Sequence, residues 1–416
     1  MRSPLPFSYS PRVPGRLFGE LPSPDPCKRA DSRHSAYRRY AKRNMKQTYA
    51  VLSFSLFGLL SITAEAAAPT PMSPPRTLYA VNEAPSDRGS ISVYDIEAGH
   101  RLVKTITTVP GVGDVRGVAV SAVTGKLYVA YRNVSGAGMI YSLNVYDDTI
   151  DWNKALAPGV DRLAINPDGR LLYVPTWEGG SADYINVLNA GSGDVVRQVH
   201  FSNRSHDTQY PSSGPIFQET KAEDGTGNYL YLIDPVSYAV SRVGPYSGVL
   251  GPYAVDSTSN YVVNNVRDLW GMQVANLKTG QILTASIRDP PPGDVGLLHG
   301  IGWTPDQTEV WQNGSWDDPH VYIWDMRNPM APVVKDRLTL RSSRGSHWLT
   351  FDIKGDYGYI APNKNSADGT EIFNVRTHTF VGVIGSSEDM LEIDFANGKS
   401  AKSVISTELE DVNTPN

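Results

Sequence analysis

Short hydrophobic stretches separated by polar turns run through most of the chain from residue 77 onward. The stretches are rich in Val, Ile, Tyr and Trp, and they are bounded by Asp, Asn, Gly or Pro. This pattern is typical of β-strands, whereas an amphipathic helix repeats its apolar positions about every three to four residues. Helical periodicity is nearly absent, so the sequence predicts an all-β fold and disfavours an α/β fold.

One pair of strands recurs at a nearly constant interval. Each copy has a polar or special residue, a β-rich strand, a turn with Asp, Asn or Gly, and a second strand with Tyr or Trp. The copies start at residues 116, 161, 206, 251, 299 and 347, which are 45, 45, 45, 48 and 48 residues apart. A third and a fourth strand follow each pair. Four antiparallel strands in about 40–50 residues are typical of one β-propeller blade.

The two ends of the repeat region complete the ring. Residues 77–106 supply the outer half of a blade, and the segment from Leu391 to a strand near Val404 supplies an inner half. Joining these halves removes the exposed sheet edges of an open array and brings the total to seven blades. The sequence therefore predicts one seven-bladed β-propeller over residues 77–406, closed by pairing of N- and C-terminal half-blades, with 407–416 as a flexible tail.

Several motifs carry a resemblance to a known family. The turns Asn166-Pro167-Asp168-Gly169, Thr304-Pro305-Asp306 and Lys278-Thr279-Gly280 recur beside strands such as Leu172-Tyr173-Val174. On these motifs the chain resembles the YVTN-repeat β-propellers, the YncE-like group, over residues 77 to about 406. The resemblance implies a WD40-like propeller of repeated blades. It implies no particular reaction, because this family is mostly without assigned chemistry.

The first 67 residues differ in character from the repeat region. Residues 1–44 are rich in Pro, Arg and Ser and predict an unstructured leader or upstream extension. Residues 45–67 combine a basic start, a charge-free run from Ala50 to Ile62 and small residues near Ala66, as in a secretory signal peptide. We expect a secreted or extracytoplasmic protein translated from Met45, the alternative being a transit or anchor segment. The run is short for a membrane span, which takes about 20 residues, so none is expected in the mature chain.

Removing residues 1–67 changes the charge and the redox chemistry expected of the domain. The whole chain has a net charge of −5, but those residues hold 11 of 38 basic and 4 of 43 acidic residues, which leaves −12. Such a charge disfavours nucleic acid as a partner. The single cysteine, Cys27, also lies in the leader, so the domain has no disulfide. We expect a monomer, with the sequons at Asn133, Asn203 and Asn313 as surface glycosylation sites if the host glycosylates.

The starts of the innermost strands give the candidate site, because these strands line the central channel of a propeller. We predict that His206, His299 and His347 are its catalytic side chains, since neutral imidazole moves protons and binds divalent metals. The predicted ligand contacts at the same channel mouth are Arg116, Asp161, Arg162, Glu392, Trp303 and Trp348.

Each candidate has a structural alternative. Histidines at a channel mouth are often only hydrogen-bonded to a neighbouring strand, and no His-x-x-x-His or Cys-x-x-Cys spacing supports the divalent metal. The five tryptophans of two adjacent blades could stack on a sugar or an aromatic ligand, or pack between blades; they are Trp303, Trp311, Trp316, Trp324 and Trp348. Asp317-Asp318 with Asp325 could bind calcium or be a solvated acidic loop.

Two functions remain open. The first is a secreted propeller that binds a small molecule or a protein partner at the channel mouth without changing it. The second is an enzyme of the lyase, isomerase or lactone-hydrolase type that uses the mouth histidines for acid–base or metal-assisted chemistry. Neither a Gly-x-Ser-x-Gly elbow nor a P-loop is present. Haem binding is a related idea, although no Cys-x-x-Cys-His attachment motif occurs.

Overall fold

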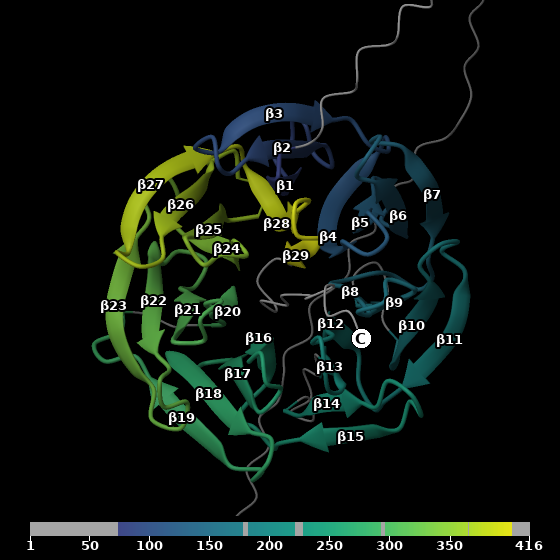
Figure 1. Ribbon diagram of the computed structural model, residues 1–416. Helices are drawn as coiled ribbons and strands as arrows, with labels where there is room; N and C mark the ends of the chain where they lie inside the picture. Colours follow the sequence, from purple (N-terminus) through teal and green to yellow (C-terminus); the bar gives the residue numbers. More distant parts are fainter. Residues whose placement is uncertain (1–73, 178–181, 221–227, 293–295, 365, 402–416) are drawn as a thin grey trace, which may run out of the picture. The chain divides into compact units, whose positions relative to one another are not determined.

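The fold is taken from a computed structural model of the chain (Figure 1). It describes residues 74–177, 182–220, 228–292, 296–364 and 366–401. The predicted leader 1–44, the signal peptide 45–67, the strand near Val404 and the tail 407–416 lie outside these residues.

Every strand belongs to one of seven antiparallel sheets, and each sheet is one blade. Strands are given from the channel outward. Blade 1 holds β28 (Ser387–Asp394), β1 (Arg76–Asn82), β2 (Ile91–Asp95) and β3 (Arg101–Ile106), with β29 (Lys399–Ala401) on the other edge of β28. Blade 2 holds β4 (Val112–Ser121), β5 (Lys126–Asn133), β6 (Gly138–Asn144) and β7 (Ile150–Ala155). Blade 3 holds β8 (Ala164–Ile165), β9 (Leu171–Val174), β10 (Tyr184–Asn189) and β11 (Val195–His200).

The remaining four blades follow the same plan. Blade 4 holds β12 (Ser205–Gln209), β13 (Ile216–Thr220), β14 (Leu230–Ile233) and β15 (Val240–Val243). Blade 5 holds β16 (Leu250–Val255), β17 (Tyr261–Val266), β18 (Gly271–Asn276) and β19 (Ile282–Ser286). Blade 6 holds β20 (Ile301–Trp303), β21 (Glu309–Asn313), β22 (His320–Asp325) and β23 (Val333–Thr339). Blade 7 holds β24 (Ser346–Phe351), β25 (Tyr357–Pro362), β26 (Thr370–Asn374) and β27 (Thr379–Ile384).

The seven blades form a ring around a central axis, which confirms the predicted all-β seven-bladed propeller (Figure 1). The described residues contain no α-helix. Accordingly, that part of the chain offers no helix long and apolar enough to cross a membrane.

Blade 1 closes the ring with strands from both ends of the chain. β1 pairs with β28 through partners such as Thr77↔Ile393 and Tyr79↔Leu391, and β1 also pairs with β2. The N-terminal segment therefore supplies three strands, β1 to β3, and the C-terminal segment supplies β28 and the short β29. β1 therefore has hydrogen-bonding partners on both sides, as a central strand does, and it is buried along its whole length.

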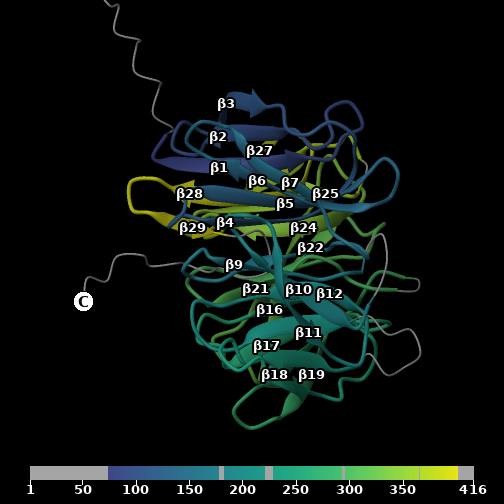
Figure 2. The same cartoon turned by 90° about the vertical axis from the view of Figure 1, so that its right-hand side faces the viewer.

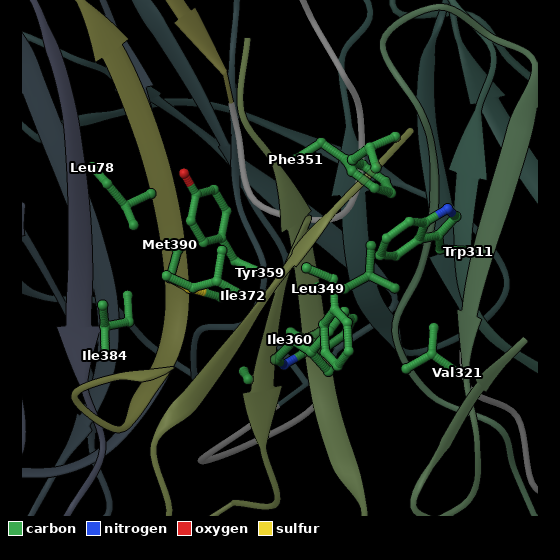
Figure 3. Close-up of a cluster of buried hydrophobic side chains, with 14 of the residues drawn as sticks. Leu78, Trp311, Val321, Leu349, Phe351, Tyr359, Ile360, Ile372, Ile384 and Met390 are labelled. Atoms are coloured by element: carbon green, nitrogen blue, oxygen red, sulfur yellow. The ribbon is translucent and has the colours of Figure 1, made fainter. Parts of the chain in front are cut away.

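The hydrophobic core lies between neighbouring blades. Innermost strands such as β16 and β24 are buried along their length, whereas outer strands such as β11 are mostly exposed. Figure 3 shows one cluster in which Leu78 of blade 1, Tyr359 of blade 7 and Trp311 of blade 6 belong to the same buried group. Alternating side chains of each strand thus face the next blade, and burial of these apolar faces supplies the main stabilisation of the ring.

Antiparallel pairing gives the ring two different faces, at the right and left edges of the side view in Figure 2. The innermost strands begin at one face, and the loops between second and third strands lie at the same end. We call this end the mouth face. The turns between first and second strands, and between third and fourth strands, form the opposite face.

Candidate functional site

The structure places five predicted residues within an innermost strand or up to three residues before it. Arg116 is in β4 and His206 in β12, His347 is in β24, and Asp161 and His299 come just before β8 and β20. All five are buried. The repeat interval therefore located equivalent positions around the mouth face.

Asp161 joins three blades. Its Oδ1 accepts a hydrogen bond from Arg116 Nη2 of blade 2 at 3.0 Å. Its Oδ2 lies 3.7 Å from Nε2 of His206 in blade 4. His206 Nδ1 in turn lies 2.9 Å from Oε2 of Glu219 on the neighbouring strand β13. His206 is thus held between two carboxylates on its own side of the mouth.

Arg162 reaches from blade 3 to the other side of the mouth. Its Nη1 and Nη2 lie 3.1 Å and 3.3 Å from the two carboxylate oxygens of Asp389 in blade 1. Its guanidinium carbon lies 3.5 Å from the centre of the Trp348 ring in blade 7. A cation over an indole face is attracted by the ring quadrupole, and an arginine–carboxylate pair adds two directional contacts. These contacts connect blade 3 to blades 7 and 1, whose strands β24 and β28 are distant from Arg162 in sequence.

His299 and His347 form the centre of an aromatic group. Their ring centres lie 4.1 Å apart. Nδ1 of His299 lies 3.0 Å from the backbone oxygen of His347, which can only accept a hydrogen bond, so this nitrogen carries the proton. The Trp316 ring lies 5.1 Å from His299 and 5.0 Å from His347. Trp348 packs on the same two imidazoles, at 4.3 Å and 5.0 Å.

The two tryptophans differ in exposure. Trp348 is buried, whereas Trp316 has 44% of its surface exposed at the mouth face. Trp316 is therefore the accessible aromatic surface of this group, and it belongs to the loop between β21 and β22.

Glu388 was missed by the sequence reasoning and contacts both central residues of blade 7. Its Oε1 lies 2.8 Å from His347 Nδ1 and accepts a hydrogen bond from Trp348 Nε1 at 3.3 Å. Burial raises the pKa of Glu388. Burial, followed by the charge of Lys364, holds the pKa of His347 well below its usual value, so this imidazole is neutral at physiological pH.

A second charged group was also missed. It joins Asp114 on the innermost strand β4 to residues at or after the ends of second strands. Asp114 accepts hydrogen bonds from Arg132 Nε at 2.9 Å, and Lys364 Nζ lies 2.6 Å from its Oδ1. Burial raises the pKa of Asp114, but the nearby cations outweigh this, and the net shift is downward. Glu83 receives the backbone N–H of Val115 at 3.3 Å. Burial, with repulsion from Glu388, raises the pKa of Glu83 to about 8.

Two predicted ligand contacts lie elsewhere. Glu392 pairs with Arg76 Nε at 2.7 Å and accepts the Ile353 N–H at 2.6 Å. This places it near the opposite end of β28, because the strand begins at Ser387 and Glu392 is its sixth residue. The mouth position of blade 1 is Glu388, which follows Ser387 as His347 follows Ser346. Trp303 is a core residue whose Nε1 donates to the Ala254 oxygen of blade 5 at 3.4 Å.

The structure also bears on the acidic residues of blade 6 and on one sequon. Asp318 precedes β22 and accepts the Tyr322 hydroxyl at 2.8 Å, whereas Asp325 is the last residue of that strand and pairs with Arg327, so the two side chains have separate partners. Asn313 is completely buried, so in the folded chain it is not a surface sequon. Within the described ranges, no three His, Cys, Asp or Glu side chains are arranged to hold a metal ion.

No protein-family model matches the chain, and no curated protein matches it either. Its fold is similar to that of dihydro-heme d1 dehydrogenase NirN in complex with DHE, with 13% identity, a TM-score of 0.52, and coverage of 77% of this chain and 76% of that one. Kuenenia stuttgartiensis hydrazine synthase has 12% identity and a TM-score of 0.53 over 70% and 95% of the two chains. The Myceliophteria thermophila Cps50 (Swd1) β-propeller domain has 12% identity and a TM-score of 0.53, with coverage of 67% of this chain and 88% of that one. At these identities the similarity establishes the propeller fold alone.

Proposed function

We propose that this protein is an exported YVTN-repeat propeller that binds a small, polar, ring-containing molecule at the channel mouth without changing it. The exposed face of Trp316, packed on His299 and His347, carries the proposal. An indole face surrounded by hydrogen-bonding groups suits a sugar or a heteroaromatic ring, since apolar stacking and polar contacts act together.

The charged residues around the Trp316 surface also support a binding site. Arg116, Arg162 and Lys364 each face a buried carboxylate, and the charges of all three act on His347 of the aromatic group. Buried polar groups in fixed geometry can orient a ligand without reorganising when it binds. A ligand on Trp316 would meet side chains that are already ordered.

Binding is tested by calorimetry with monosaccharides, nucleosides and aromatic carboxylates as probes. We expect at least one probe class to bind saturably, and Trp316→Ala to weaken it about tenfold, since aromatic pairs contribute roughly 0.5–1.5 kcal/mol beyond area burial. Tyr146→Ala is the matched control, because Tyr146 is 67% exposed and lies in the turn between β6 and β7 on the opposite face. Failure of every probe class to bind, or an equal loss in both variants, contradicts the proposal.

The second candidate function is acid–base catalysis at the same mouth, of the lyase, isomerase or lactone-hydrolase type. The position of Glu388 Oε1, 2.8 Å from Nδ1 of His347, favours it, because a neutral imidazole beside a buried carboxyl group can exchange a proton with a ligand. Similar solved structures include two proteins named as enzymes, a dehydrogenase and a hydrazine synthase, although they share only the fold.

Turnover assays separate this candidate from simple binding. Lactones and β-eliminating sugar acids serve as probes, with His347→Ala and Glu388→Gln as variants. His200→Ala is the control, because this histidine is 59% exposed and lies on outer strand β11. Turnover lost in both mouth variants and kept in the control supports catalysis, whereas binding without turnover leaves the first function.

Export is supported by the sequence of residues 45–67 and is tested by sequencing the N-terminus of the protein recovered from its host. We expect the mature chain to begin near Ala68. A mature chain that keeps Met45 or starts at Arg2 contradicts the signal peptide.

A further inference from the structure

A histidine on the face opposite the mouth is held between two carboxylates of the neighbouring blade. His378 lies in the turn between β26 and β27 of blade 7. Its Nδ1 lies 2.6 Å from Asp336 Oδ2 on β23, and its Nε2 lies 3.2 Å from Glu309 Oε2 on β21. Ionised carboxylates only accept hydrogen bonds, so both ring nitrogens must carry protons in this geometry. The structure therefore holds an imidazolium across the seam between blades 6 and 7.

Glu309 is the centre of the cluster. It is nearly buried, it accepts the Trp311 indole N–H at 2.8 Å, and it pairs with Lys335. Hydrogen bonds from His378, Lys335 and Trp311 outweigh burial and lower the pKa of Glu309. The His378 ring also meets the Trp311 ring edge-on at 5.9 Å.

Glu309 also lines a cavity of about 540 Å³ between the two blades. The wall comes from the turn after β20, the turn after β24 and the turn after β26. The other charged groups on this wall are Asp306, Lys354, Asp356 and Arg376. Lys354, in the β24–β25 turn, is paired with Glu97 at 2.8 Å. The contacts of His378 form a charged link between the β26–β27 turn and blade 6.

The backbone at His378 has the conformation that this turn also adopts in other blades. Its φ is +56°, in the left-handed region that non-glycine residues seldom adopt, and His100 and Asp148 in the same turn of blades 1 and 2 have φ of +61° and +62°. The turn conformation therefore belongs to the blade pattern, and the carboxylate contacts of His378 are added to it.

We propose that His378 is a proton-operated latch between blades 6 and 7 that sets how tightly the wall of this cavity is closed. With both ring protons present, the β26–β27 turn is tied to two strands of blade 6. Loss of either proton leaves a lone pair facing a carboxylate, which removes one hydrogen bond and the charge attraction to both acids. The turn then separates from blade 6 and the cavity widens.

The direction of the pH effect follows from the environment of the ring. The hydrogen bond to Glu309 raises the pKa of His378; burial opposes this, and Asp336 raises the pKa further. A histidine whose pKa is higher in the folded than in the unfolded chain stabilises the fold fully below about pH 6.5. That stabilisation is lost as the pH rises through the folded pKa, so the latch is closed in acid and open in base.

The test is an NMR titration of the full-length protein from pH 5.5 to 9. We expect the His378 ring to titrate above pH 6.5, and the indole N–H resonance of Trp311, which reports on Glu309, to shift with the same midpoint. His378→Gln should abolish the Trp311 titration. His200→Gln is the matched control, because His200 also faces an aspartate, Asp183, but is largely exposed, and it should leave the Trp311 titration unchanged.

A second variant keeps the test decisive if His378→Gln does not fold. Asp336→Asn removes one carboxylate and should lower the His378 midpoint. The proposal is overturned by any of three results. They are a His378 midpoint at or below pH 6.5, a Trp311 indole N–H resonance that does not shift with the same midpoint, or an Asp336→Asn variant with an unchanged His378 midpoint.

Discussion

The guanidinium of Arg162 in blade 3 meets the carboxylate of Asp389 in blade 1 across the channel mouth, with Nη1 3.1 Å from Oδ2. Both side chains are almost fully buried. Asp389 lies on β28, the C-terminal strand that closes the ring by pairing with β1. The contact therefore ties the C-terminal strand β28 of blade 1 to blade 3, two blades along the ring, in a domain whose sequence has no cysteine after residue 27.

Arg162→Ala should lower the free energy of unfolding by about 3–5 kcal/mol, because removing one partner leaves the Asp389 charge buried. Urea denaturation of variant and parent measures this change. Arg101→Ala is the control, since Arg101 is 64% exposed and pairs with Asp95 at 3.4 Å, a surface contact of about 0–1 kcal/mol. Equal midpoint shifts in the two variants would show that the pair across the mouth has no special role.

Ring closure gives a second prediction. A chain that ends at Gly385 lacks β28, so the inner edge of β1 is unpaired, and such an edge promotes association. We expect oligomers or aggregates by light scattering and a lower melting temperature. A chain that ends at Gly398 loses β29 alone among the described strands and should keep the oligomeric state of the parent. A Gly385 chain that keeps that state and melts like the parent contradicts the role of β28.

The sequence interval located the strands well because each blade repeats the same strand pattern. It found Arg116, Asp161, His206, His299 and His347 because these occupy one repeated position at the start of the innermost strand. It misplaced the equivalent position in blade 1, where the spacing from His347 to Glu388 is 41 residues rather than 45–48. Ser346 precedes His347 and Ser387 precedes Glu388, and this shared serine is the sequence feature that aligns the two positions.

The interval between innermost strands alone does not predict the contacts across the channel. Glu83, Arg132 and Lys364 come from segments at or after the end of a second strand, where sequence and length vary between blades. Extending the interval to the ends of second strands would have placed them at the mouth face. No local pattern distinguishes Trp316, which is exposed there, from Trp303 in the core, since the difference depends on which blade surfaces meet.

The two tryptophans that flank the mouth histidines should differ in their effect on stability. Trp348→Ala removes a buried indole that packs on Arg162 and donates to Glu388, and should cost about 3–5 kcal/mol. Trp316→Ala removes a ring that is 44% exposed and should cost less than about half of that. Thermal and urea unfolding compare the two. A larger loss for Trp316→Ala would make that residue a packing residue and would weaken its assignment as a ligand surface.

The raised pKa of Glu83 leads to a prediction of how the free energy of unfolding depends on pH. Burial and the repulsion of Glu388 raise its pKa from 4.5 to about 8, so the folded chain keeps a proton that the unfolded chain releases. The stabilising effect of that proton is complete below about pH 4.5 and is lost as the pH rises towards 8, with a slope of at most about 1.4 kcal/mol per pH unit.

Glu83→Gln keeps the shape of the side chain and removes this titration, so its free energy of unfolding should fall less than the parent's between pH 5 and pH 9. Urea midpoints at several pH values measure the difference. Glu97→Gln is the control, because Lys354 and Arg76 lower the pKa of Glu97, and its titration ends below this range. If parent and Glu83→Gln lose stability in parallel between pH 5 and 9, Glu83 does not titrate in this range, which contradicts its raised pKa.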